Sequence, residues 1–332
     1  MATSTELMPV SVRERYLGLL YASFVGDSFA LAPHWIYDQE EITERFGRLT
    51  DLQSPDESEY HQEKEEGDQT HYGDQALVLL ESLEASGGNF VVEDFAKRWR
   101  ELWKKPSVYR DHATKDTLSN LESGRGLTRS GSASRELGGA ARLAPLLVAL
   151  RGEEPETIIG AARAQTALTH AAPEVIDAAE FIARTVFLLV KGVSLAPALE
   201  MASALNYRSL QPQIYLRHTL DLAHLSTAQA VEELGQSCPL EKAFPSSLSI
   251  LLRHGDDMEI AFIENVHAGG DSAARGMMLG ILLGAAQGIH AVPERWLARL
   301  RARPQLDHFV KTVGLGNLRK CQSRIACEQR TF

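Results

Sequence analysis

The sequence predicts an all-α protein that folds as a single-domain, compact multi-helix bundle. Apolar side chains recur at helical spacing along most of the chain, and no run alternates cleanly between apolar and polar residues as a half-buried strand would. No stretch rich in proline, glycine and serine is long enough to separate two domains. We therefore assign residues 1–332 to one domain.

The same periodicity places the helices in order. In the first of them, Leu19, Leu20 and Phe24 share one face, and a pair of glycines, Gly87-Gly88, ends the second. The expected helices cover 12–25, 74–85, 91–103, 137–150, 156–167, 175–190, 195–205, 212–224, 227–235, 239–253, 257–265, 272–289 and 293–302.

The segment from about 50 to 72 interrupts this helical pattern. It is acidic and polar (residues 51–72 read DLQSPDESEYHQEKEEGDQTHY), so we expect a long loop there. Long loops in compact domains are often functional, although an acidic one is commonly just solvated. A second loop-rich stretch is expected over 105–135.

A stripe of small residues marks two of the expected helices. The stripe consists of Gly276, Gly280, Gly284 and Gly288 in one helix and of Gly18, Ala22 and Gly26 in the other. A glycine inside a helix costs roughly 1 kcal/mol relative to alanine, and close approach of another backbone would offset that cost. We therefore expect these two helices to pack together. Their relative direction decides whether Asp27 and Asp271 lie close together or at opposite poles.

Composition excludes several classes of function. The formal net charge of −10 argues against nucleic-acid binding, which needs clustered Lys and Arg to neutralise phosphates. The most apolar run, 277–286, is too short to span a membrane, and the N-terminal residues lack the pattern of a secretory signal. The three cysteines, Cys238, Cys321 and Cys327, match no zinc or redox motif. Reduced thiols in a cytoplasmic protein are the expectation.

Five segments place small or polar residues at helix ends, where a bundle forms its cleft. They are 26–38, 70–83, 130–145, 168–175 and 267–276. The cleft is expected to be lined by Asp27, His34, Asp74, His170 and Asp271. Helix capping is the simpler interpretation of Asp74 and Asp271 taken singly, and packing is the simpler one of His34.

In this order the five segments resemble the ADP-ribosylglycohydrolase family, and most closely its J1-crystallin branch. The matching residues are Gly26-Asp27 through Pro33 for the family's GDALG-A-P segment, Tyr72-Gly73-Asp74-Gln75 for TDDT, LGGAARLAP (137–145) for NGGAMR-V-A-P, Thr169-His170 for the threonine-histidine motif, and Gly269 to Ala274 for GGDTDT. The likeness covers nearly the whole chain, from Gly26 to Gly288.

The resemblance implies an all-α fold with a pair of magnesium ions in a central cleft. It also implies hydrolysis of the glycosidic bond that links ADP-ribose to a side chain or a small molecule. Breaking the bond at the anomeric carbon builds positive charge that a carboxylate stabilises. Magnesium orients ribose hydroxyls and requires hard oxygen ligands, which accounts for two clusters of Asp and Thr in the family's motifs.

This sequence departs from the family at the metal ligands. Ala273 and Ala274 replace an aspartate and a threonine, and His34 replaces a carboxylate. In the TDDT segment only Asp74 is kept, and Leu137 replaces an asparagine. These changes argue against a dinuclear magnesium site.

Three arrangements stay open. One divalent cation, magnesium by resemblance, is held by Asp74, Asp271 and Ser272. Alternatively, His34 and His71 form a remodelled site for zinc, manganese or iron, which imidazole suits better than magnesium. In the third arrangement no metal takes part, His34 is the general base, and Asp74 or Asp271 orients it. The expected contacts to phosphate or ribose are Ser132, Ser134, Gly138, Gly139 and His170.

Two functions follow from these arrangements. The first is a divergent hydrolase with His34, Asp74 and Asp271 as catalytic residues, which cleaves an N- or O-glycosidic bond of an ADP-ribose-like substrate. Its substrate is a small molecule or an ADP-ribosylated partner. The alternative is a non-catalytic relative with a degenerate metal site, either a nucleotide-binding module or a crystallin-like structural protein.

Overall fold

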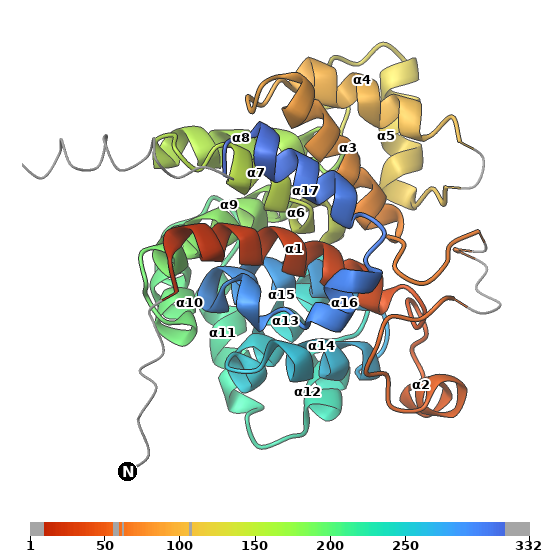
Figure 1. The fold of residues 1–332 in the computed structure, drawn as a ribbon, viewed down its shortest axis with the longest axis vertical. Coiled ribbons are helices and arrows are strands. Elements are labelled where there is room, and N and C mark those ends of the chain that lie inside the picture. The colour runs from red at the N-terminus through yellow and green to blue at the C-terminus, as the bar shows by residue number, and fades with distance from the viewer. Residues whose placement is uncertain (1–9, 56–59, 62, 106–107, 316–332) are drawn as a thin grey trace, which may run out of the picture.

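The helices of the chain pack around a central antiparallel pair (Figure 1). The computed structural model describes residues 10–55, 60–61, 63–105 and 108–315. Its helices are α1 (Val12–Ala30), α2 (Gln39–Phe46), α3 (His71–Ala85), α4 (Val92–Leu102), α5 (His112–Glu122), η1 (Leu127–Arg129), α6 (Gly138–Ala141), α7 (Ala144–Ala149), α8 (Pro155–Ala167), α9 (Pro173–Val190), α10 (Leu195–Ser203), α11 (Pro212–Asp221), α12 (Thr227–Leu234), α13 (Leu240–His254), α14 (Met258–His267), α15 (Ser272–Gln287), η2 (Ile289–Ala291), α16 (Glu294–Arg299) and α17 (Arg303–Thr312). Within these residues, β-type pairing consists of two isolated bridges, so the all-α prediction is confirmed.

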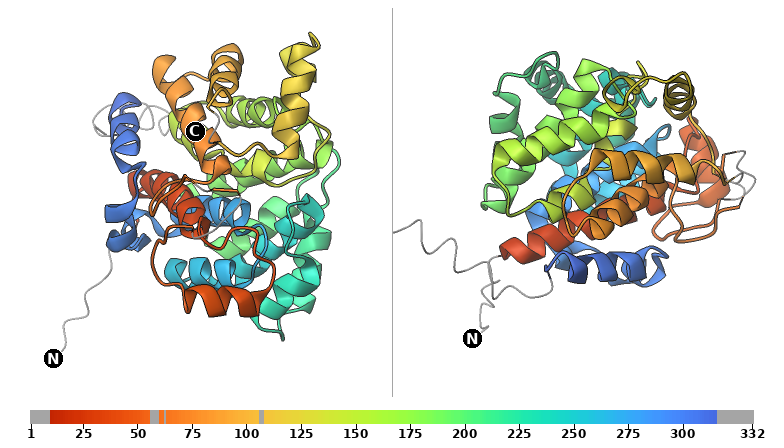
Figure 2. Two further views of the ribbon diagram at one scale, coloured as in Figure 1. Left: turned by 90° about the vertical axis from the view of Figure 1, so that its right-hand side faces the viewer. Right: turned by 90° about the horizontal axis from the view of Figure 1, so that it is seen from above.

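Helices α1 and α15 form the central pair, as the small-residue stripe predicts. A Cβ atom on Gly26 would lie 2.2 Å from the carbonyl oxygen of Gly276, and one on Gly280 would lie 2.2 Å from that of Ala22. Real side chains do not fit at such distances, so the two backbones touch along the stripe. Helix α15 also packs against α9, α13 and α14, while α16 and α17 cover α1 (Figures 1 and 2).

The antiparallel direction of the pair decides where the acidic residues lie. Gly26, near the end of α1, faces Gly276, near the start of α15. Asp27 and Asp271 therefore lie at the same end of the bundle. The first turn of α3 lies at this end too, on the side of the molecule that faces the viewer in the left panel of Figure 2.

Two expected helix boundaries differ from the structure. The helix expected over 137–150 is divided into α6 and α7, because Pro145 has no N–H to continue the hydrogen bonding of α6. Helix α3 begins at His71 rather than at residue 74, because the side chain of Thr70 accepts a hydrogen bond from the N–H of Tyr72 and caps the helix there. Asp74 thus lies inside the first turn and is not the cap that the sequence suggested.

Three α-helices of the described residues were not predicted from the sequence: α2, α5 and α17. The described part of the polar loop at about 50–72 is free of helix up to His71, as expected. Among the described residues no helix is both long and apolar enough to cross a membrane. Cys321 and Cys327 lie outside the described residues.

Candidate active site

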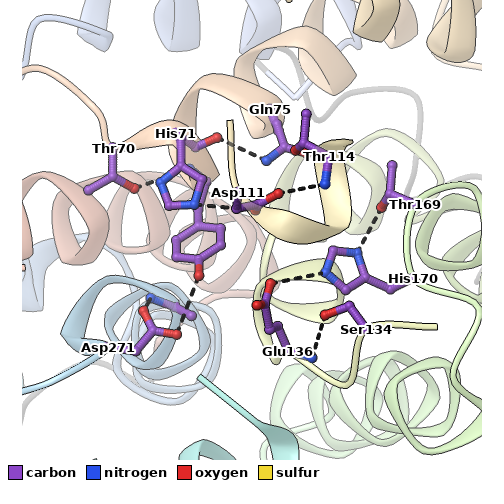
Figure 3. Close-up of polar contacts among 12 residues, drawn as sticks. Thr70, His71, Gln75, Asp111, Thr114, Ser134, Glu136, Thr169, His170 and Asp271 are labelled. Atoms are coloured by element: carbon purple, nitrogen blue, oxygen red, sulfur yellow. Dashed lines mark hydrogen bonds and ion pairs between the residues drawn. The ribbon is translucent and has the colours of Figure 1, made fainter. Parts of the chain in front are cut away.

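The candidate site lies where the end of α1, the first turn of α3 and the start of α15 meet. Asp27 comes from α1, His71 and Tyr72 open α3, and Asp271 precedes α15. His34 comes from the segment between α1 and α2. Figure 3 shows Asp271 beside the first turn of α3, with Asp111 and His170 on the far side of that turn. The site thus collects segments that are far apart in the sequence.

Asp271 both caps a helix and contacts two site residues. One carboxylate oxygen, Oδ1, accepts a hydrogen bond of 3.4 Å from the N–H of Ala274, which confirms the expected capping role. The other, Oδ2, accepts a hydrogen bond of 3.5 Å from the hydroxyl of Tyr72 (Figure 3). Nδ1 of His34 lies 3.8 Å from Oδ1. Burial raises the pKa of Asp271 to about 6, so this carboxyl group titrates near neutral pH.

Asp27 is held by the residue that caps α3. Its carboxylate accepts hydrogen bonds from the backbone N–H of Thr70 at 2.7 Å and from the Thr70 hydroxyl at 2.5 Å. Gly73 leaves room for this contact, since a Cβ atom there would lie 2.3 Å from the Asp27 carboxylate. Burial raises the pKa of Asp27 to about 7, although the hydrogen bonds from Thr70 act in the opposite direction.

The structure does not bring Asp74 to Asp271. Tyr72 and Asp74 are two residues apart on α3, so their side chains project to nearly opposite faces of the helix. Tyr72 contacts Asp271, whereas Asp74 forms an ion pair with Lys64, whose Nζ lies 2.7 and 2.8 Å from the two carboxylate oxygens. The two carboxylates expected to hold one cation thus have different partners: Lys64 for Asp74, and the Tyr72 hydroxyl for one oxygen of Asp271. The residues do not fit a magnesium site shared by Asp74, Asp271 and Ser272.

Gly138 and Gly139 provide space for two rings. A Cβ atom on Gly138 would lie 2.3 Å from the ring of Tyr72, and one on Gly139 would lie 2.5 Å from the ring of His170. Nδ1 of His170 lies 3.0 Å from the hydroxyl of Thr169, and its Nε2 lies 3.9 Å from the carboxylate of Glu136 (Figure 3). The glycine pair therefore sets the positions of two side chains at the site.

Ser132 and Ser134 lie beside His170 on the neighbouring loop. Ser132 pairs with His170 through an isolated parallel bridge, and its hydroxyl donates a hydrogen bond of 2.8 Å to Asp116. The hydroxyl of Ser134 accepts a hydrogen bond from the N–H of Glu136. Ser132 also lines a pocket of about 570 Å³. Other residues that line this pocket are Asp116, Arg125, Arg135 and Glu174.

The structure brings His34 and His71 together, as the remodelled-site arrangement expected, in a cluster of rings whose other members the sequence did not indicate. The cluster consists of His34, Trp35, Tyr60, His61, His71, Tyr72 and Tyr109. His34 stacks on Trp35 with ring centroids 4.3 Å apart, and the rings of His71 and Tyr72 lie 3.9 Å apart. The only sequence signal for His61 is its neighbour Tyr60, which places two aromatic rings in an acidic loop.

Two histidines of this cluster, His34 and His61, are poor bases. Burial lowers the pKa values of His34 and His61 well below the usual range, and the neighbouring imidazoles lower them further. His71 lies next to a carboxylate, with 3.4 Å between its Nε2 and Oδ2 of Asp111 (Figure 3). Asp111 also caps α5 by accepting a hydrogen bond from the N–H of Thr114.

The buried side chain of Arg142 connects residues that lie next to the site. The guanidinium of Arg142 donates hydrogen bonds to Gln165, to Gln75 and to the hydroxyl of Thr169. Burial lowers the pKa of Arg142 to about 10. This network joins α3 to the residue before His170, which the sequence alone did not indicate.

Three comparisons with known proteins match this chain over most of its length. The ADP-ribosylglycohydrolase family model matches residues 8–323. A protein of Archaeoglobus fulgidus described as "Uncharacterized protein" is 26% identical over 302 residues, which is 90% of this chain and 95% of the relative. A solved structure described as "ADP-ribosylglycohydrolase-related protein complex" is 23% identical, with a TM-score of 0.72 over 91% of this chain and 98% of that chain. The structural likeness supports the fold.

Proposed function

Because the chain belongs to the ADP-ribosylglycohydrolase family, we propose that it is a divergent hydrolase of an N- or O-glycosidic bond in an ADP-ribose-like substrate. The substrate class follows from the family description, and it covers both small molecules and ADP-ribosylated proteins. We also propose that the chain belongs to the J1-crystallin-like branch of the family, because its sequence motifs resemble that branch. A cytoplasmic location is proposed from the cysteine content of the sequence.

The observation that carries the proposal is the buried pair of Asp271 and His34. Cleavage at an anomeric carbon needs a carboxylate near the developing positive charge and a group that moves a proton to or from water. Asp271, with a pKa raised to about 6, suits the first task. For the second we propose His34, whose Nδ1 lies 3.8 Å from that carboxylate. Burial lowers the pKa of His34 and keeps the imidazole neutral, so its proposed role is to relay a proton between water and Asp271 and not to hold it as a strong base. Asp74 is assigned instead to the ion pair with Lys64.

The substrate's phosphate and ribose oxygens are proposed to meet Ser132, Ser134 and His170, next to Gly138 and Gly139. The pocket beside Ser132 has room for a sugar phosphate, and Arg125 and Arg135 supply positive charge at its wall. Asp116 and Glu174 line the same pocket with an equal negative charge, and Arg135 lies 3.8 Å from Glu174. Within this proposal the phosphates lie at the edge of the pocket, close to Arg125 and Arg135.

The resemblance to the family implies a magnesium ion bound by Asp74 and Asp271. We propose that this chain does not bind one there. Asp74 is neutralised by Lys64, and the Tyr72 hydroxyl donates a hydrogen bond to one oxygen of Asp271. We therefore assign the stabilisation of positive charge at the anomeric carbon to the side chain of Asp271. This stabilisation does not depend on magnesium.

One observation favours the second candidate function, a non-catalytic nucleotide-binding or structural relative. The side chains of His34 and Asp271 are both fully shielded from solvent. Tyr72, which contacts Asp271, is also buried. A substrate reaches them only if the surrounding segments move. A protein of this second kind binds ADP-ribose or related nucleotides without turning over any glycoside.

Release of ADP-ribose from a panel of ADP-ribosylated proteins and small molecules tests the proposal. The matched variants are Asp271→Asn and Asp257→Asn, since both aspartates cap helices but Asp257 caps α14 on the surface. We expect turnover by the wild type and by Asp257→Asn, and a loss of about 100-fold or more in Asp271→Asn. Binding of ADP-ribose without turnover by the wild type would instead establish the second function.

A further inference from the structure

Three histidines converge in the ring cluster at the candidate site. His34, His61 and His71 each offer a ring nitrogen, and these three atoms lie within 4.8 Å of one another. All three residues are buried, with at most 3% of their surface exposed. They come from three segments: the turn after α1, the polar loop and the first residue of α3.

The nitrogens of these histidines lack hydrogen-bond partners. Both ring nitrogens of His34, both of His71 and Nε2 of His61 are buried without one. A buried polar group left without a partner destabilises a folded protein, so such a group calls for an explanation. Stacking of the rings explains their packing but leaves these nitrogens unsatisfied. A bound cation would satisfy one nitrogen from each ring.

One nitrogen of His71 and one of His34 lie next to carboxylates. Nε2 of His71 lies 3.4 Å from Asp111, and Nδ1 of His34 lies 3.8 Å from Asp271. Metal-ligating histidines usually direct their second nitrogen to a carboxylate or a carbonyl, which fixes the tautomer and makes the imidazole a better ligand. This arrangement leaves Nδ1 of His71 and Nε2 of His34 for a metal, together with Nε2 of His61.

We propose that His34, His61 and His71 bind one divalent transition-metal ion, most suitably zinc, at a site distinct from the family's magnesium pair. Three neutral imidazoles suit zinc, whereas magnesium requires hard oxygen ligands. Zinc–nitrogen bonds of about 2.0–2.1 Å place neighbouring ligand nitrogens about 3.4 Å apart, so modest shifts of the side chains complete the site. The proposed metal site shares His34 with the proposed hydrolase: a His34 that binds zinc through Nε2 and faces Asp271 through Nδ1 would leave proton transfer to a zinc-bound water. Metal retention is measured without substrate, so failure of this proposal and failure of the proposed function are distinguishable.

Three protein ligands leave a fourth position open on zinc. A zinc ion with an open position lowers the pKa of a bound water to near neutrality, which is the chemistry such a site supplies. Asp111 and Asp271 then serve as positioning residues for the ligands.

Metal content tests the site directly. The full chain is stripped with a chelator, loaded with zinc, dialysed and analysed for bound metal; in a second arm cobalt replaces zinc and its visible absorption is recorded. We expect one zinc per chain, and cobalt absorption typical of tetrahedral imidazole ligation. Failure of the wild type to retain zinc or cobalt overturns the proposal, and this arm needs no variant to fold.

Substitutions locate the metal. His61→Gln and His71→Gln remove ligands. His267→Gln alters a half-buried histidine that accepts a hydrogen bond from the N–H of Leu49, and His290→Gln alters an exposed one. The two controls should retain zinc like the wild type, whereas the two ligand variants should lose it on dialysis. Equal retention by all four variants places the metal elsewhere and refutes the assignment.

Asp111→Asn tests the carboxylate next to His71. Asparagine caps a helix as well as aspartate does, so α5 should stay intact. The variant is expected to bind zinc about 10–100-fold more weakly than the wild type, with cobalt absorption of the same type. Unchanged affinity would contradict the role of Asp111 as the partner of a metal-bound imidazole.

Discussion

At the scale of single residues, the glycines of the site act by leaving room for rings. The Gly138-Gly139 pair first suggests backbone N–H groups exposed to a phosphate. In the structure each glycine instead has a ring where its Cβ atom would lie, that of Tyr72 for Gly138 and that of His170 for Gly139. The sequence located these residues at the site, but it could not show that their missing side chains serve the packing of other residues.

Gly139→Ala should displace the His170 ring. The added methyl would lie 2.5 Å from that ring, and we expect a loss of about 1–3 kcal/mol in the free energy of unfolding. Gly160→Ala is the matched control, because Gly160 is an exposed residue of α8 with open space around it. Chemical denaturation should show the control to be more stable than the wild type by about 0.5–1 kcal/mol. Equal stability of the two variants would contradict the packing role of Gly139.

Asp27 should make stability depend on pH. Its pKa is raised from 3.8 to about 7, so the folded state binds the proton more tightly than the unfolded chain does. The stability that the protonated group contributes is fully present below about pH 4 and is lost as the pH rises to about 7. Two nearby groups also affect the pKa of Asp27: the carboxylate of Asp74 raises it, and His71 lowers it.

Asp27→Asn, which is neutral at every pH, should remove this dependence. The free energy of unfolding of the variant minus that of the wild type should rise between pH 4 and 7, by up to about 4 kcal/mol, and then level off. Urea denaturation over this pH range measures the difference, with Asp257→Asn as an exposed control. A flat difference would show that Asp27 is ionised in the folded protein throughout.

At the scale of elements, one pair of helices determines where the site forms. The period of the glycines predicted that α1 and α15 touch, but only the structure shows that they run antiparallel. That direction brings Asp27 and Asp271 to one end of the bundle. Other helix boundaries depend on single residues, and the spacing of apolar residues does not show their effect. Pro145 divides one predicted helix, and Thr70 starts α3 earlier than its apolar residues suggest.

Gly280→Ala should separate the central pair. The new methyl would meet the backbone of Ala22 rather than a side chain that can turn away, so relief requires one helix to shift. We expect a loss of about 3 kcal/mol or more in the free energy of unfolding, compared with the gain expected for Gly160→Ala. Thermal and chemical denaturation measure this loss. A variant as stable as the wild type would show that the helices are not in backbone contact.

At the scale of the whole molecule, the sequence predicted the fold better than the site. Ordered motifs spread over the chain identify the family even where individual ligands have changed, because the helix packing that they encode survives those changes. The site depends on directions that spacing does not determine. Asp74 and Tyr72 are close in the sequence yet face opposite sides of α3, and His61 reaches the site from a loop without any helical pattern.

Asp271, which the sequence shares with the family's motifs, lies in the same site as the clustered histidines His34, His61 and His71. Asp271 is close to His34, and His34 is one of the three clustered histidines. The proposed catalytic carboxylate and the proposed metal site are therefore adjacent. We propose that this chain uses three imidazoles packed among aromatic rings as its metal site, and not the aspartates that the resemblance implies for a magnesium pair. This assignment is the central claim.

A crystal structure of the chain soaked with ADP-ribose and zinc tests that claim most directly, with anomalous scattering used to locate the metal. We expect a single zinc peak among His34, His61 and His71, and the ribose anomeric carbon beside Asp271. A metal bound instead between Asp74 and Asp271, with Lys64 displaced, would contradict it.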